Sequence, residues 1–119
     1  MRVLVVDDRP DVRLSLVYML EASGFDVAEA SDGAQALGLV EKHRVEVVLT
    51  DLAMPGMDGR ELTKELVARS RYRPRVIVMS GSERLESVDA AELGADAVLS
   101  KPFTRDQLVQ TIKTTYNNP

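Results

Sequence analysis

Short, continuous apolar runs alternate along this chain with segments whose apolar residues recur at helical spacing. The runs that predict strands are Val3–Val6, Phe25–Ala30, Val45–Thr50, Arg75–Met79 and Ala97–Leu99. The segments after each run predict five helices, because their apolar residues fall three or four positions apart. A loop is expected over residues 51–59, and the third helix from Arg60 to about Ser70. Alternating strands and helices favour an α/β fold, with a parallel sheet, right-handed crossovers and helices on both faces.

Capping residues mark the ends of the predicted helices. Pro10 suits the first turn of the first helix, and Gly24 suits its C-terminal end. Residues 31–33 supply turn and N-cap chemistry before the second helix, Gly94 ends a short fourth helix, and Thr104 can cap the last one. The residues expected to form the apolar sides of the other helices are Val12, Leu16, Met19, Leu20, Ala36, Leu37, Val40, Leu62, Leu66, Leu108 and Ile112. Leu85, Val88 and Ala91 mark the short fourth helix.

The second and fifth strands are expected at the edges of the sheet. Asp26 and Glu29 interrupt the second run, and the fifth run is brief, whereas the first, third and fourth are apolar as in strands buried on both faces. The strand order 2-1-3-4-5 satisfies these conditions.

Length and composition exclude several classes of protein. A chain of 119 residues is expected to form a single domain, residues 1–119. The net charge of −4 argues against a nucleic-acid-binding face. The absence of cysteine excludes disulfides and Cys-ligated zinc or iron–sulfur sites. The first apolar run is too short for a signal peptide, and no stretch approaches the ~20 apolar residues of a membrane span. A soluble, cytoplasmic protein is therefore expected.

Polar residues follow four of the predicted strands. Asp7 and Asp8 follow the first strand, Asp51 the third, Ser80 the fourth and Lys101 the fifth. In an open parallel sheet the ligand crevice lies beyond the carboxyl ends of the strands, where the strand order reverses. For the order 2-1-3-4-5 that point lies between the first and third strands, so the three carboxylates are expected to meet there.

Close carboxylates repel one another unless a cation or protons intervene. Mg²⁺ prefers oxygen ligands and often binds through one or two carboxylates together with phosphate oxygens. Lys101 adds a mobile positive charge, Ser80 a hydroxyl donor and Gly81 an accessible backbone N–H, which together could neutralise a phosphoryl group in transfer. The nucleophile expected at the centre is the carboxylate of Asp51.

Each of these residues taken singly has a structural explanation, as a turn or cap acid, a loop acid, a turn serine or a solvated lysine. Their joint placement at four strand ends is not expected by chance.

Two other functions would use the same acids, a Mg²⁺-dependent phosphohydrolase and a binding module with an acidic pocket. Against the hydrolase, the chain leaves no room for a cap domain, and Ala53 stands where a second catalytic acid would be. No Gly-rich loop ending in Lys-Ser or Lys-Thr indicates nucleotide binding.

Over about residues 2–115 the chain resembles the receiver domain of bacterial two-component response regulators. The matching motifs are Val5-Val6-Asp7-Asp8, Asp51-Leu52-Ala53-Met54-Pro55-Gly56-Met57-Asp58-Gly59, Met79-Ser80-Gly81 and Lys101-Pro102-Phe103. The resemblance implies a flavodoxin-like, doubly wound, five-stranded parallel sheet of order 2-1-3-4-5 with five helices.

The resemblance also implies the metal ligands. Asp51 would be the phosphorylated residue and, with Asp8, a direct ligand of Mg²⁺, for which Mn²⁺ could substitute. Asp7 would bind the ion directly or through water, and the backbone carbonyl of Ala53 would be a further ligand.

Other residues would contact the phosphoryl group. Lys101 would pair with it, the Ser80 hydroxyl would move to meet it, and the backbone at Ala53 and Gly81 would contact it. The Lys101–Pro102 bond would be cis. Receivers often carry Tyr or Phe three residues before the lysine, where this chain has Val98, so the aromatic half of the usual rearrangement is missing.

The implied function is a signalling switch that catalyses only its own phosphorylation and dephosphorylation. A sensor histidine kinase, a phosphotransfer protein or a small phosphodonor would supply the phosphoryl group. The surface formed by the fourth helix, fifth strand and fifth helix would then regulate an output partner or effector domain, and it could form a homodimer. No direct nucleic-acid or membrane partner is expected. The kinase, the output, and the choice between a stand-alone regulator and a piece of a transcription factor or hybrid kinase are left open.

Several polar residues are expected to lie outside the site. His43 is expected on the surface, and residues 116–119 as a frayed end. A solvated face is expected for Arg69, Arg71, Arg73 and Arg75, and for Glu83, Glu86 and Asp89 on the fourth helix.

Overall fold

A computed structural model of the chain describes residues 1–69, 73–81 and 90–117. Five parallel strands form one sheet in the order β2-β1-β3-β4-β5, as the sequence predicts. The strands are β1 (Arg2–Val6), β2 (Asp26–Ala30), β3 (Val47–Asp51), β4 (Arg75–Ser80) and β5 (Ala97–Ser100). The helices are α1 (Pro10–Ala22), α2 (Gly33–Lys42), α3 (Gly59–Val67), α4 (Ala90–Leu93) and α5 (Arg105–Asn117).

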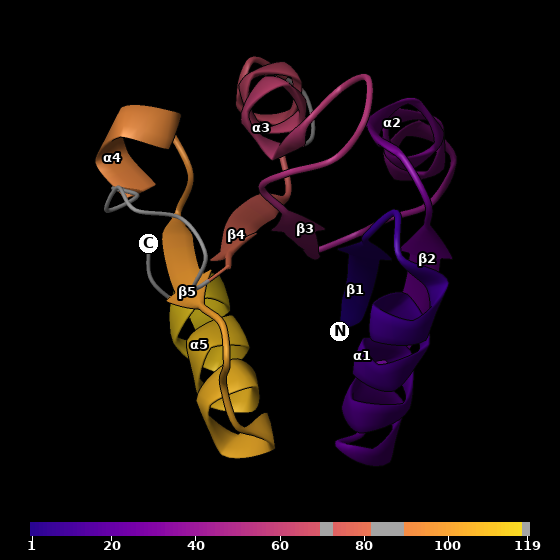
Figure 1. Cartoon of the computed structure of the whole chain (residues 1–119), viewed down its shortest axis with the longest axis vertical. Helices are drawn as coiled ribbons and strands as arrows, with labels where there is room; N and C mark the ends of the chain where they lie inside the picture. Colours follow the sequence, from indigo (N-terminus) through magenta and orange to yellow (C-terminus); the bar gives the residue numbers. More distant parts are fainter. Residues whose placement is uncertain (70–72, 82–89, 118–119) are drawn as a thin grey trace.

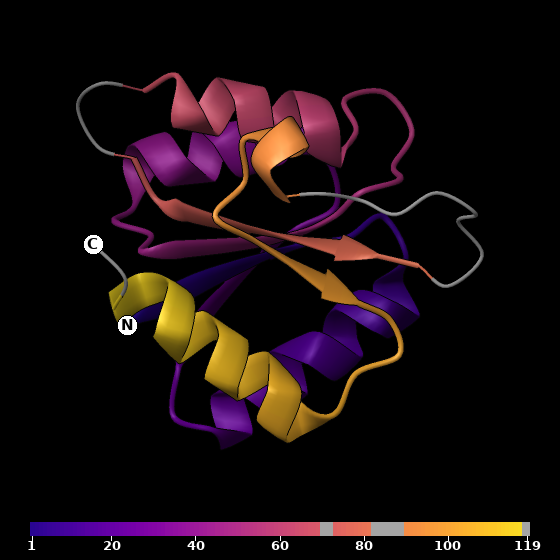
Figure 2. The ribbon, with the colours of Figure 1, turned by 90° about the vertical axis from the view of Figure 1, so that its left-hand side faces the viewer.

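Helices cover both faces of the sheet (Figures 1 and 2). α1 and α5 lie on one face, while α2, α3 and α4 lie on the other. Alternate residues of β1 supply the two cores, with Val3 and Val5 packed towards α1 and α5, and Leu4 and Val6 towards the opposite helices. Burial on both faces explains the continuous apolar runs of β1, β3 and β4.

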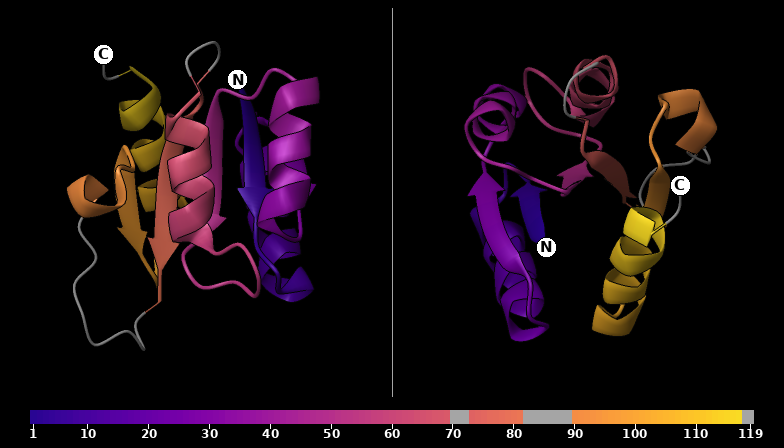
Figure 3. Two further views of the ribbon diagram at one scale, coloured as in Figure 1. Left: turned by 90° about the horizontal axis from the view of Figure 1, so that it is seen from above. Right: turned by 180° about the vertical axis from the view of Figure 1, so that it is seen from behind.

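The strands end together at one edge of the sheet, where their arrowheads gather in the left view of Figure 3. The outer strands are β2 and β5, and the acids Asp26 and Glu29 of β2 are exposed as an edge position predicts. The polar residues singled out in the sequence lie at the carboxyl ends of these strands.

Local hydrogen bonds confirm the predicted helix ends. Asp32 accepts a hydrogen bond from the Gln35 backbone N–H at 2.8 Å and caps α2. Thr104 and Gln107 exchange hydrogen bonds at 2.8 and 3.1 Å, which form a capping box at the start of α5. Gly24 follows α1 with φ of +93°, a left-handed conformation that glycine adopts without steric cost.

Several predicted boundaries need correction. β3 begins at Val47 and includes Asp51, which pairs with Met79 of β4 instead of opening the loop. α3 begins one residue earlier than predicted, because Asp58 caps it, and ends at Val67. The expected frayed end is wrong for residues 116 and 117, since α5 continues to Asn117 and Thr115 in its last turn is buried. Leu85 and Val88, which mark the predicted fourth helix, lie outside the described residues, and Ala91 is exposed in α4.

The basic run is also more structured than a solvated face. Arg69 forms an ion pair with Glu41 at 3.2 Å. Arg73 and Arg75 approach Asp96 at 3.2 and 4.0 Å. The expectations for Arg71 and for the acids at 83, 86 and 89 fall outside the described residues.

In the described part of the chain, none of the helices has the length and apolar character required to cross a membrane.

Candidate functional site

The carboxyl ends of β1 and β3 bring three acids together. Val6 and Thr50 are partners in the parallel register, so Asp7 and Asp51 leave the two strands side by side. One carboxylate oxygen from each of Asp7, Asp8 and Asp51 lies within 4.8 Å of the others. The predicted cluster is therefore present, at a spacing that a single divalent cation could bridge.

Asp7 is the fully buried member of the cluster. Its Oδ1 accepts a hydrogen bond from the Arg9 backbone N–H at 3.0 Å, whereas its buried Oδ2 has no hydrogen-bond partner. Burial raises the pKa of Asp7, and the charges of Asp51 and Asp8 raise it further against the opposing effects of the Arg9 N–H and Lys101. A buried, unsatisfied carboxylate oxygen is costly, and a cation bound beside it would remove that cost.

Replacing Asp7 with asparagine is expected to stabilise the metal-free fold at neutral pH. The raised pKa means that the folded state binds the Asp7 proton more tightly than the unfolded chain does. The free energy of unfolding therefore falls as pH rises from the ordinary pKa of 3.8 through the raised pKa. Asparagine carries no charge to desolvate, and a gain of about 1–2 kcal/mol is expected. Urea unfolding in the presence of a chelator, at mildly acidic and neutral pH, measures the difference.

Asp32→Asn is the matched control, because Asp32 is exposed and asparagine also caps helices well. Its stability should change little. Added Mg²⁺ should stabilise the native chain more than Asp7→Asn. Two results would contradict this prediction. One is equal stabilisation of the native chain and Asp7→Asn by Mg²⁺, and the other is a native chain whose stability rises as the Asp7 carboxyl ionises.

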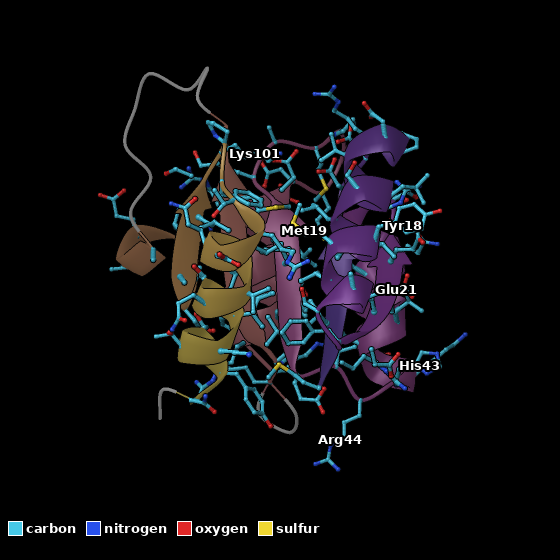
Figure 4. All side chains as sticks on the ribbon, turned by 90° about the horizontal axis from the view of Figure 1, so that it is seen from below. Tyr18, Met19, Glu21, His43, Arg44 and Lys101 are labelled. Carbon is cyan, nitrogen blue, oxygen red and sulfur yellow. The ribbon has the colours of Figure 1, made fainter. Side chains whose placement is uncertain are left out.

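Lys101 extends from the end of β5 towards the acids. Its Nζ lies 3.6 Å from Asp51 Oδ1 and 3.9 Å from Asp7 Oδ2. The Lys101 side chain is 28% exposed and that of Asp51 13%, so their attraction acts in a partly water-excluded place. Figure 4 shows Lys101 at the edge of the sheet where the strands end. The Lys101–Pro102 bond is cis, as the family resemblance implies.

Ser80 closes the side of the site formed by β4. It is the last residue of that strand, is buried, and pairs with Ser100 of β5. Its carbonyl accepts a hydrogen bond from the Lys101 backbone N–H at 2.8 Å, which ties the two strand ends together. Gly81 follows directly and is half-buried.

The loop from β3 to α3 is held by close packing at both ends. The Gly59 backbone N–H donates to the Leu52 carbonyl at 2.9 Å, and a Cβ on Gly59 would meet the Asp51 carbonyl oxygen and lie 2.8 Å from Leu52 Cα. Met57 packs so closely on Gly33 that a Cβ there would lie 2.7 Å from its sulfur. Ala53 is exposed between these anchors.

Sequence reasoning missed Arg13, which supports the acids from α1. Its Nη1 donates to the Asp7 carbonyl at 2.8 Å, and its Nε donates to Glu29 of β2 at 2.9 Å. The side chain is only 15% exposed. Arg13 therefore connects the end of β1 with α1 and β2. Only its position one turn into a helix that follows two acids could have suggested this role.

Two other residues lie where the sequence predicts. His43 is exposed at the C-terminal end of α2, at the opposite edge of the sheet from Lys101 (Figure 4). Val98 is half-buried against the core beneath α2, α3 and α4. An aliphatic side chain therefore occupies the position three residues before Lys101.

Comparisons with known proteins show what most of the chain is similar to. A family model described as the response regulator receiver domain matches residues 3–113. The chain is 35% identical over 112 residues to the alkaline phosphatase synthesis transcriptional regulatory protein PhoP of Bacillus subtilis, covering 94% of the chain and 47% of PhoP. It is 38% identical to the DNA-binding response regulator MtrA of Mycolicibacterium smegmatis, again over 94% of the chain and 49% of MtrA. It therefore spans about half the length of these relatives.

Solved structures and a kinase relative extend the comparison. The structure of FixJ-N superposes with a TM-score of 0.88 at 31% identity, covering 99% of the chain and 94% of that structure. The chemotaxis protein CheY4 of Vibrio cholerae superposes with a TM-score of 0.85 at 29% identity, covering 96% and 97%. The sensor histidine kinase RcsC of Salmonella typhi is 38% identical over 94% of the chain, which spans 12% of RcsC.

Proposed function

Because the chain belongs to the response regulator receiver domain family, we propose that Asp51 accepts a phosphoryl group and thereby switches a partner-binding surface. The observation that carries the proposal is the grouping of Asp7, Asp8 and Asp51 within 4.8 Å, with Lys101 Nζ 3.6 Å from Asp51. An acceptor carboxylate, a set of cation ligands and a nearby positive charge are the groups that phosphoryl transfer requires.

The residues present fit a bound Mg²⁺, or Mn²⁺ in its place. The Oδ2 of Asp7 accepts no hydrogen bond and so can ligate a cation, and Asp8 and Asp51 supply further hard oxygen ligands. The backbone carbonyl of exposed Ala53 would complete the protein's share of the ligands. The ion would supply charge neutralisation between the acceptor and the incoming phosphoryl group.

In the transfer step an Asp51 carboxylate oxygen attacks phosphorus, and the bond to the donor's leaving group breaks. Lys101 pairs with the phosphoryl oxygens, while the Ser80 hydroxyl and the backbone N–H groups at Ala53 and Gly81 donate hydrogen bonds. The aspartyl phosphate adds about −1.5 to −2 charge units if it resembles other phosphorylated side chains. The donor would be a histidine kinase, a phosphotransfer protein or a small phosphodonor, with residues 1–119 acting as one domain.

Ser80 and Lys101 link the chemistry to the surface. Ser80 ends β4 and Lys101 directly follows β5, and a backbone hydrogen bond joins them, so movement towards the phosphoryl group would be passed to β5. The responding surface would be α4–β5–α5, which would bind an output partner, an effector domain or a second copy of the chain. The rearrangement of this surface would proceed without an aromatic side chain at position 98, where the chain has Val98. Coupling of this kind is typically worth about 1–3 kcal/mol.

The function is tested by incubating the native chain with acetyl phosphate. With Mg²⁺ present, intact-mass measurement should find one added phosphoryl group, and chelation of the metal should prevent its addition. No adduct with Mg²⁺, or the same yield after chelation, would contradict the proposal. Sustained turnover of a generic phosphate ester would instead favour the phosphohydrolase.

A further inference from the structure

Arg13 of α1 holds the peptide group that joins two of the proposed metal ligands. Its Nη1 donates to the Asp7 carbonyl at 2.8 Å, and its Nε donates to Glu29 of β2 at 2.9 Å. A guanidinium is planar and presents its N–H groups in a rigid fork, so these two hydrogen bonds orient the group together. Because α1 lies beside β1 and β2 (Figure 1), the arginine connects the end of β1 with the edge strand β2.

The carbonyl that Arg13 holds controls the orientation of the Asp7 and Asp8 carboxylates. The peptide bond between these two residues is planar, so a hydrogen bond to its carbonyl limits rotation of the whole plane. That rotation changes ψ of Asp7 and φ of Asp8, and with them the directions in which both side chains leave the backbone. Each carboxylate places an oxygen within 4.8 Å of the other and of Asp51, and rotation of the peptide would disturb this set.

The other polar groups of Asp7 are held as well. Its backbone N–H donates to the Ala30 carbonyl at 3.2 Å, and its Oδ1 accepts the Arg9 backbone N–H at 3.0 Å. Within the described part of the chain, its Oδ2 accepts no hydrogen bond. Asp7 is therefore fixed by three neighbours while one oxygen stays available to a cation. Of these three contacts, the one from Arg13 is made by a side chain, so a substitution can remove it.

The charge of Arg13 by itself acts against a cation at the acidic cluster. Like charges repel, so removal of the arginine would tighten cation binding if charge alone mattered. The ion pair with Glu29 at 2.9 Å reduces this repulsion, because the two side chains together carry no net charge. Loss of the hydrogen bond to Asp7 has the opposite effect, since it frees the backbone between two ligands. The sign of the change in affinity therefore distinguishes the two effects.

We propose that Arg13 is a positioning residue for the divalent cation, and that it holds the Asp7–Asp8 peptide so that both carboxylates are directed to the ion. Glu29 holds the guanidinium in turn. The proposal rests on the proposed function, because it requires that the acidic cluster binds Mg²⁺ or Mn²⁺. Replacing residues that orient metal ligands typically lowers metal affinity by about 10- to 100-fold. Arg13 acts through the backbone of its ligands, so a loss at the lower end of this range is expected.

The test measures Mg²⁺ affinity by calorimetry, in chains whose circular dichroism is native. Methionine is unbranched and apolar and donates no hydrogen bond, so Arg13→Met should bind Mg²⁺ about tenfold more weakly than the native chain. Arg13→Lys keeps the charge but lacks the planar fork, and should weaken binding about threefold, at roughly half the free-energy cost of methionine. It provides the same comparison if methionine prevents folding.

Glu29→Gln separates the hydrogen bonds of Arg13 from its charge. Glutamine keeps an oxygen that can accept from Arg13 Nε, while the negative charge is lost. The Glu29 side chain is 43% exposed, so removal of its charge should change Mg²⁺ affinity by about twofold or less. A loss as large as that in Arg13→Met would show that charge, and not position, sets the affinity, and it would overturn the proposal.

Arg2→Met is the matched control. Arg2 also joins β1 to an acid of β2, since its Nε donates to Asp26 at 3.0 Å, but it lies at the opposite end of both strands. Each methionine variant removes one arginine and one ion pair between the same elements of the sheet edge. A merely structural role would lower stability to urea in both variants without changing Mg²⁺ affinity. Only Arg13→Met should weaken Mg²⁺ binding.

Three further results would overturn this proposal and leave the proposed function intact. They are equal Mg²⁺ affinity in the native chain and both Arg13 variants, tighter binding by Arg13→Met, and equal weakening by Arg2→Met. A native chain that binds no Mg²⁺ would instead overturn the proposed function together with the role of Arg13.

Discussion

Asp51→Ala is expected to abolish the phosphoryl adduct that the native chain forms with acetyl phosphate and Mg²⁺. Asp51 is the member of the acidic cluster nearest to Lys101, at 3.6 Å, and it retains access to solvent. Asp7 is fully buried and cannot meet a donor without opening the fold. Since alanine has no oxygen to attack phosphorus, the expected yield is zero. Intact-mass measurement after equal incubation checks it.

Asp58→Ala provides the matched control, because it removes an acid from the loop that follows Asp51. Asp58 caps α3 by accepting the Glu61 backbone N–H at 2.9 Å, so its loss should cost about 1 kcal/mol of stability. The adduct should still form on the folded chain. Equal yields from the native chain and Asp51→Ala would mean that another residue is the acceptor, and loss of the adduct in Asp58→Ala alone would point to that acid.

Gly59→Ala is expected to destabilise the fold by about 3 kcal/mol, at the upper end of the usual range for overpacking. A Cβ at this position would collide with the Asp51 carbonyl oxygen and lie 2.8 Å from Leu52 Cα. Both obstacles are backbone atoms at the end of a buried strand, so neither can turn aside as a flexible side chain would. Urea unfolding of the native and variant chains measures the difference in free energy.

Gly38→Ala is the control, because no atom lies within 4 Å of a Cβ built there, in the interior of α2. It should stabilise the chain by about 0.5–1 kcal/mol, since alanine favours helix over glycine. Gly59→Ala should also slow phosphorylation in the fraction that remains folded, because relief of the collision displaces Asp51. A Gly59→Ala chain as stable as the native one would show that β3 and α3 separate easily.

Much of the architecture follows from local patterns. β1, β3 and β4 are continuous apolar runs because both of their faces are covered, and Asp26 and Glu29 interrupt β2 because it lies at an edge. The strand order places Asp7 beside Asp51 through a simple register, in which Val6 pairs with Thr50. Element boundaries were less predictable, since the end of a strand depends on its partners, as the pairing of Asp51 with Met79 shows.

The acidic cluster could be predicted because residues at the ends of parallel strands share one edge, whatever the details of packing. The sequence by itself determined the alternation of strands and helices, the sheet order and the identity of the acids. Only the tertiary structure decided the buried, unsatisfied oxygen of Asp7 and the support from Arg13. It also decided the approach of Gly59 to Asp51, and the pairing of Arg73 with Asp96. The physical reason is that these features depend on distances between segments far apart in the chain, which side-chain packing sets and local periodicity does not encode.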